Sequence, residues 1–167
     1  MADKKIIAEV ESNMKEFLRE CKITKEINIQ YTGFFIKNAQ NSFNSAKLLF
    51  NVSSNQDLKK SLGFPNFNGY LWVINSSYYS MFYMARALLE SQGIKIKAKQ
   101  SIHAITFNAL VYYFYLTKKI EKHLIEEFQK AGNEASEILG KEKAEDLIRG
   151  YFNEKDKRER FTYEMGE

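Results

Sequence analysis

Apolar residues recur at helical spacing along most of the chain. Near the amino terminus the apolar residues form one stripe, which consists of Ile6, Ile7, Val10, Met14, Phe17 and Leu18. Charged residues occupy the opposite face. Intervals of three and four residues predict an amphipathic helix. A second helix is predicted over 30–50. Polar residues 51–55 then interrupt the pattern, and 61–69, which contains the only proline with glycines and asparagines, predicts a loop.

The strongest helical pattern follows this loop. A long helix is predicted over 70–92 from apolar residues spaced by three and four: Leu71, Ile74, Tyr78, Met81, Phe82, Ala85, Leu88 and Leu89. Gly93 suits a left-handed stop at its end. The lysine-rich segment 94–99 is expected to be a connection. Residues 101–116 are apolar nearly all round, which predicts a central helix.

Two more helices are predicted towards the carboxyl terminus. Thr117 is expected to cap a helix that ends near Leu139, and the last helix is expected to begin near Lys141. No segment alternates between apolar and polar residues for long enough to predict a strand. We therefore expect an all-α fold, an up-and-down bundle of four to five helices with an extra N-terminal helix. Residues 1–29 would form this helical extension and 30–167 the bundle.

Composition supports this fold class and argues against a disordered or membrane-spanning chain. A chain of 167 residues with one proline and eight glycines has few turns, as long helices require. An apolar content of 44% excludes a disordered chain. The longest apolar run, 109–116, is far shorter than the roughly 20 residues of a membrane span. We expect a cytoplasmic protein with no membrane partner, and the single cysteine, Cys21, excludes an internal disulfide.

The common catalytic and metal-binding motifs are absent. There is no glycine-rich phosphate loop and no His-Glu-x-x-His, and His103 and His123 lie on different predicted helices. No Glu-x-x-His pair supports a di-iron bundle, so neither a metal nor another cofactor is expected. The net charge of +4 is compatible with nucleic acid. Residues 94–119 contain five lysines and no acid: Lys95, Lys97, Lys99, Lys118 and Lys119.

Four segments carry a resemblance to a known family. The long helix reads Ile74-Asn-Ser-Ser-Tyr-Tyr-Ser-Met-Phe-Tyr-Met-Ala-Arg-Ala-Leu-Leu-Glu-Ser-Gln-Gly93, and Ser101-Ile-His103 opens the next helix. The chain ends with Arg158-Glu-Arg-Phe-Thr-Tyr163, and Ala46-Lys-Leu-Leu49 lies upstream. From about residue 30 onward this succession resembles the HEPN family, especially its small stand-alone prokaryotic members.

The resemblance implies a dimeric helical bundle with one of several activities. Many HEPN proteins are metal-independent ribonucleases with an Arg-x(4–6)-His motif paired across the dimer. Others pair with a minimal nucleotidyltransferase in toxin–antitoxin modules or bind nucleotides. Here no histidine follows His123, and Tyr163 stands where the motif would have its histidine. A phenol with a pKa near 10 is a poor general base at neutral pH. Ser76 also replaces an arginine found in many relatives.

Three hypotheses follow from these residues. The first is a HEPN-like dimer that binds RNA or a nucleotide, or pairs with a minimal nucleotidyltransferase, with Lys97, Lys99, Arg158 and Arg160 as the binding residues. The second is a metal-independent endoribonuclease in which Arg158 holds the phosphate while Tyr163 or His103 transfers protons. The third is a purely architectural helical homodimer.

Overall fold

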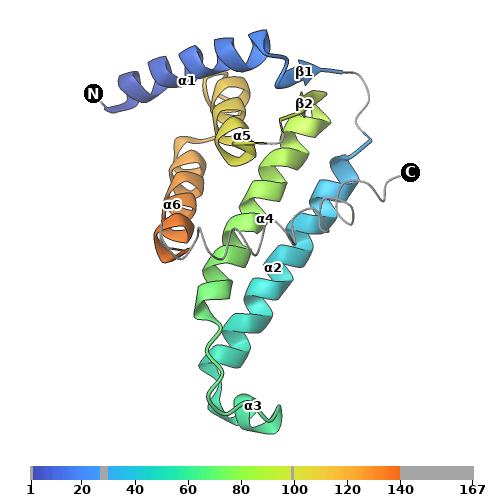
Figure 1. Ribbon diagram of the computed structural model, residues 1–167, viewed down its shortest axis with the longest axis vertical. Coiled ribbons are helices and arrows are strands. Elements are labelled where there is room, and N and C mark those ends of the chain that lie inside the picture. The colour runs from blue at the N-terminus through green and yellow to red at the C-terminus, as the bar shows by residue number, and fades with distance from the viewer. Residues whose placement is uncertain (1, 27–29, 99, 140–167) are drawn as a thin grey trace. The chain divides into compact units, whose positions relative to one another are not determined.

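The computed structural model describes residues 2–26, 30–98 and 100–139 (Figure 1). The chain divides into two compact units, Met1–Gly132 and Asn133–Glu167. The second unit is described only over 133–139, the end of a helix that begins in the first. The predicted final helix near Lys141 lies outside the described residues.

Helices dominate the described residues, which confirms the predicted all-α class. In chain order the elements are α1 (Ala2–Arg19), β1 (Ile23–Lys25), α2 (Thr32–Ser54), α3 (Gln56–Ser61), α4 (Tyr70–Ser91), β2 (Ile94–Ile96), α5 (Ile102–Leu110), the π-helical turn η1 (Val111–Tyr115) and α6 (Lys122–Leu139). No described helix combines the length and the apolar character that crossing a bilayer requires.

A small antiparallel sheet corrects the prediction that 94–99 is only a connection. Strand β1 pairs with β2 in the register Ile23 to Ile96 and Lys25 to Ile94. The three isoleucines are buried, while Lys25 faces outward. Each strand has three residues, which is too short for an alternating pattern to stand out in the sequence. Gly93 adopts the expected left-handed backbone, with a φ of 71°, at the end of α4.

Two predicted helix boundaries are wrong. Helix α2 continues into the polar run as far as Ser54, and Asn55 then caps α3 by accepting a 2.9 Å hydrogen bond from the Leu58 N–H. Polar residues are tolerated there because most of them face solvent. Thr117 caps no helix, since its hydroxyl donates back to the Tyr113 carbonyl at 2.7 Å. Lys118 adopts a φ of 58°, and α6 begins only at Lys122.

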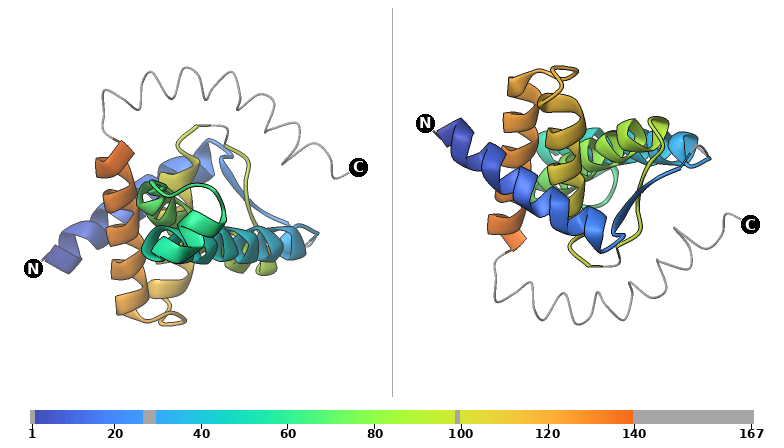
Figure 2. Two further views of the ribbon diagram at one scale, coloured as in Figure 1. Left: turned by 90° about the horizontal axis from the view of Figure 1, so that it is seen from below. Right: turned by 90° about the horizontal axis from the view of Figure 1, so that it is seen from above.

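The main hydrophobic core lies among α1, α4, α5 and the start of α6. Its fully buried members include Met14 of α1, Leu89 of α4 and Ile105 of α5, with Phe128 of α6 packed against them. Helix α1 crosses α5 at the end of α4 that is remote from α3 (Figures 1 and 2). The prediction that residues 101–116 are central is therefore confirmed, and the amino-terminal helix contributes directly to the core.

Helix α2 lies outside this core and packs along α4. The two helices run antiparallel, with α3 at the turn between them (Figure 1). The Ser80 hydroxyl donates to the Ala39 carbonyl at 3.0 Å, and the Phe35 and Tyr83 rings stack at 6.4 Å. We call α2, α3, the following loop and α4 the hairpin. One face of α4 packs on α2, and the opposite face of its carboxyl-terminal half packs on the core.

Candidate interaction surface

His103 is the predicted catalytic residue that the structure describes most fully. It lies at the start of α5, where its Nδ1 shares a 2.8 Å hydrogen bond with the Tyr78 hydroxyl of α4. Its ring stacks on Tyr78 at 5.5 Å and lies 4.2 Å from the centroid of the Phe82 ring. These contacts place the imidazole inside an aromatic cluster between two helices.

Burial makes this His–Tyr pair electrically neutral. Desolvation, with a smaller contribution from the charge of Arg86, lowers the pKa of His103 to about 4. Burial raises the pKa of Tyr78 to about 12. At neutral pH the imidazole is therefore unprotonated and the phenol keeps its proton. Because such a weakly basic imidazole has little affinity for a proton, this environment suits packing better than proton transfer.

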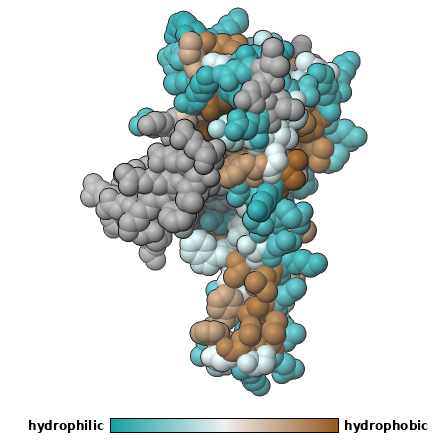
Figure 3. Space-filling model, turned by 90° about the vertical axis from the view of Figure 1, so that its right-hand side faces the viewer, coloured by the Kyte–Doolittle hydropathy of each residue, from teal (hydrophilic) through white to brown (hydrophobic). Residues whose placement is uncertain are grey.

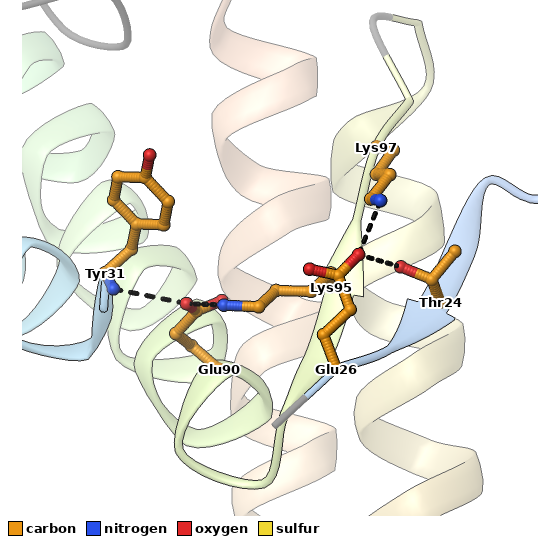
Figure 4. Close-up of polar contacts among 6 residues, drawn as sticks. All are labelled: Thr24, Glu26, Tyr31, Glu90, Lys95 and Lys97. Atoms are coloured by element: carbon orange, nitrogen blue, oxygen red, sulfur yellow. Dashed lines mark hydrogen bonds and ion pairs between the residues drawn. The ribbon is translucent and has the colours of Figure 1, made fainter. Parts of the chain in front are cut away.

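Two lysines in and directly after β2, Lys95 and Lys97, form ion pairs with carboxylates. Lys97, a predicted binding residue, forms an ion pair with Glu26 at 2.5 Å, and Thr24 donates a hydrogen bond to the same carboxylate at 3.1 Å (Figure 4). The Lys97 and Thr24 hydrogen bonds lower the pKa of Glu26. The positive charge of Lys97 is thus balanced within the chain.

A second ion pair lies deeper beside β2. Lys95 pairs with Glu90 at the end of α4, and the two side chains are only 11% and 4% exposed. The Tyr31 backbone N–H also donates to Glu90 at 3.2 Å, and the Lys95 ammonium lies 5.6 Å from the centroid of the Tyr31 ring (Figure 4). This cluster links the start of α2, the end of α4 and β2.

The other predicted site residues lie outside the described residues. They are Lys99, Arg158, Arg160 and Tyr163, so their roles stay predictions. Within the described ranges, no three histidine, cysteine, aspartate or glutamate side chains gather closely enough to hold a metal ion.

An exposed apolar surface runs along one side of the hairpin. Ile36, Phe43 and Phe50 of α2 are spaced by seven residues, and Tyr70 and Met84 of α4 are spaced by fourteen. Each of the five side chains is between 43% and 54% exposed. We call these five residues the hairpin side. Figure 3 shows hydrophobic side chains gathered over the part of the hairpin near α3.

The two rows of the hairpin side belong to one surface. Residues seven apart on a helix lie on nearly the same face, so each row is aligned along its own helix. The Phe50 and Tyr70 rings meet edge to face at 6.2 Å, which joins the row on α2 to the row on α4. Among the described residues, the arrangement resembles one half of the seam of a helical bundle.

The hairpin also contains more cations than acids. Between Glu26 and Glu90 the sequence contains one acid, Asp57, against five cations. One of these cations, Arg86, is buried with its guanidinium 4.7 Å from the centroid of the Phe35 ring. The hairpin therefore combines exposed apolar side chains with a sparse positive charge.

Comparisons with protein-family models, with curated proteins and with solved structures found no match to this chain. The residues and contacts described above are therefore the basis for inferring its function.

Two signals in the sequence could have pointed to this surface. One is the seven-residue spacing of Ile36, Phe43 and Phe50, which lies beside the buried stripe of the same helix. The other is the near absence of acidic residues between Glu26 and Glu90. The basic segment indicated by the sequence was 94–119, where Lys95 and Lys97 prove to be paired with carboxylates.

Proposed function

We propose that this protein is a HEPN-like helical homodimer that binds RNA or a nucleotide, or pairs with a minimal nucleotidyltransferase, without cutting RNA. The observation that carries the dimer is the hairpin side, with its five half-exposed apolar side chains at heptad spacing. The binding activity rests on the family resemblance and on the positive charge of the chain.

The size of the hairpin side supports a second copy as its occupant. A half-exposed large side chain leaves about 100 Å² in water, since burying an aromatic ring removes about 150–250 Å². Five such side chains amount to about 500 Å², more than half of the roughly 800 Å² per partner of a standard interface. Patches of several hundred Å² are unusual on monomers.

Binding without cleavage is supported by the residues available for proton transfer. His103 is paired with Tyr78 in a buried cluster, and burial lowers its pKa to about 4. The sequence has no histidine after Arg158, where the resemblance would place the catalytic base. Metal-independent RNA cleavage needs a base near neutrality to take the 2′-hydroxyl proton.

The mass of the protein in solution tests the dimer. Light scattering coupled to gel filtration should give twice the chain mass of 19.6 kDa. The double variant Phe43→Ser/Phe50→Ser should shift the protein to the monomer, because it removes two apolar contacts from each copy. Leu124→Ser, a similar change at an exposed position of α6, is the matched control and should leave the dimer intact. A monomeric wild type, or a dimer that survives the double variant, would contradict the assignment.

A separate assay tests the binding activity. The protein should retain single-stranded RNA or a nucleotide at low salt, and rising salt should weaken RNA binding through counterion release. Incubation with RNA in EDTA should leave the RNA intact. Cleavage that Arg158→Ala abolishes would instead establish the endoribonuclease. Absence of binding, together with an intact dimer, would favour the architectural alternative.

A further inference from the structure

The far end of the hairpin presents a second exposed surface, separate from the hairpin side. We call residues 56–67, which comprise α3 and the loop after it, the tip. Helix α3 has no buried residue. Leu62 is 50% exposed and Phe64 is 65% exposed, the highest value among the large hydrophobic side chains described. The tip therefore exposes apolar groups at the place most remote from the core.

Backbone hydrogen bonds hold these two side chains in a defined turn. The Leu62 N–H donates to the Leu58 carbonyl, the Gly63 N–H to Lys60 and the Phe64 N–H to Lys59, all at 2.9–3.0 Å. Gly63 supplies the left-handed backbone, with a φ of 78°, that reverses the chain between Leu62 and Phe64. Leu62 and Phe64 thus project from an ordered helix end.

Positive charge lies directly beside these apolar side chains. Lys59 and Lys60 occupy the last turn of α3, within five residues of Phe64 in sequence. Neither ammonium forms an ion pair with another described residue. Asp57 is the only acid between Glu26 and Glu90, so little negative charge in the hairpin opposes the two lysines.

A lipid surface fits this combination better than a protein does. Two exposed apolar side chains on a short turn offer far less than the roughly 800 Å² per partner of a stable protein interface. Binding to a bilayer has no such threshold, because it scales with the buried apolar area and with attraction to anionic headgroups. A fluid bilayer also accommodates an irregular turn without a complementary shape.

We propose that the tip binds the surface of an anionic lipid bilayer. Leu62 and Phe64 enter the boundary between headgroups and acyl chains, and Lys59 and Lys60 contact the lipid phosphates. This inference does not rest on the proposed dimer, which is argued from other residues of the hairpin. It differs from the expectation drawn from the sequence that the protein has no membrane partner, and the vesicle experiment below decides between them.

The single tryptophan provides a natural reporter. Trp72 lies in the first turn of α4, close in sequence to the tip, and is 48% exposed. Full-length protein should sediment with vesicles that mix phosphatidylcholine and phosphatidylglycerol, but not with phosphatidylcholine alone. The emission of Trp72 should shift to shorter wavelength with the mixed vesicles, because the indole environment becomes less polar.

Two double variants separate the apolar and the charged contributions. Leu62→Ser/Phe64→Ser should weaken binding at least about tenfold, because both side chains would no longer leave water. Lys59→Gln/Lys60→Gln should weaken it about 25-fold at low salt, since each lysine near an anionic surface contributes about fivefold. Lys118→Gln/Lys119→Gln makes the same charge change at an exposed turn elsewhere and should bind like wild type.

Several results would overturn the proposal. One is failure of the wild type to sediment with the mixed vesicles at low salt, and another is unchanged binding by Leu62→Ser/Phe64→Ser with a wild-type circular dichroism spectrum. A shift in Trp72 emission with a polyglutamate peptide, but not with vesicles, would assign the tip to an acidic protein partner. A shift on concentrating the protein alone, lost in Leu62→Ser/Phe64→Ser, would assign the tip to self-association.

Discussion

The two halves of α4 are both rich in apolar and aromatic residues but have very different surroundings. In the carboxyl-terminal half, Phe82, Ala85 and Leu89 are buried against the core, while α2 packs on the opposite face. In the amino-terminal half, Tyr70, Leu71 and Trp72 are all at least 40% exposed.

The difference comes from what covers each half. Helices α1 and α5 lie at the end of α4 remote from α3, and Phe128 of α6 stacks on Tyr78 near its middle. Among the described residues, the first turns of α4 have α2 as their neighbouring helix (Figure 1). Two packed helices bury only the stripes that face each other, and further apolar residues stay in water until another layer arrives. Apolar residues of α4 are therefore buried in the core at its carboxyl-terminal end, whereas those of its first turns stay exposed and can contact another molecule.

The largest expected effect is the loss of stability when a phenylalanine of the core is replaced, and a phenylalanine of the hairpin side provides the comparison. Phe82→Ala should lower the free energy of unfolding by about 3–5 kcal/mol, because it leaves a cavity in the core. Phe43→Ala removes a ring that is 54% exposed and should change stability by less than about 0.5 kcal/mol in dilute protein. Urea denaturation measures both. Similar losses for the two variants would mean that the hairpin side is covered within a single chain.

The next prediction concerns the buried ion pair between Glu90 and Lys95 at the carboxyl-terminal end of α4. Glu90→Gln should destabilise the protein by about 3 kcal/mol, because it leaves the ammonium of Lys95 buried without its carboxylate. Lys97→Gln, which breaks the more exposed pair with Glu26, should cost less than about 1 kcal/mol. Denaturation midpoints of the two variants give the comparison. Equal and small losses would show that the Glu90–Lys95 pair is hydrated.

The pH dependence of stability examines His103, which packs against the middle of α4. Its pKa is about 4 in the folded protein and 6.5 in the unfolded chain, so the unfolded chain binds more protons between these values. Stability should therefore be complete above pH 6.5 and fall as the pH drops towards 4, by up to about 3 kcal/mol.

Two histidine variants isolate this contribution from that of the carboxylates. His103→Gln should flatten the profile between pH 6.5 and 4, whereas His123→Gln, at an exposed position, should keep the wild-type slope. Thermal unfolding across this pH range provides the measurement. Identical profiles for wild type and His103→Gln would place the imidazole in water.

The smallest expected effect lies on the exposed surface of α2. Gly33 is helical, and no atom lies within 4 Å of the position that an added methyl group would occupy. Gly33→Ala should raise the free energy of unfolding by about 0.5 kcal/mol, because alanine loses less backbone entropy in a helix. A small rise in the melting temperature would confirm it. A loss of stability would indicate that a partner chain approaches this surface closely.

Most of the fold could be predicted because helical periodicity is a local property. The spacing of Leu71, Ile74 and Tyr78 locates α4 to within a residue at each end, and Gly93 marks its stop. The failures involve features without a local signal. Strands β1 and β2 form only because Ile23 and Ile96 meet from distant parts of the chain. Lys118 adopts a left-handed backbone directly after Thr117, where the sequence alone favoured a helix cap.

The candidate surface was harder to predict than the fold. An apolar stripe in a sequence indicates that a helix face is suited to burial, but it does not identify which stripe is covered. Phe82 and Phe43 both lie on helical stripes, and only their neighbours in space distinguish a core residue from an exposed one. Likewise, Lys95 and Lys97 indicated a basic region until the structure placed Glu90 and Glu26 beside them.

The sequence by itself therefore determined the all-α class, the main helices and the excess of positive charge, since these depend on neighbours along the chain or on composition. The tertiary structure decided which of the described apolar residues are buried and which of the described charges are paired. Burial and ion pairing are properties of groups that meet in space: α1 and α5 help to bury one end of α4, and the pairing of β1 with β2 brings Lys97 and Glu26 together.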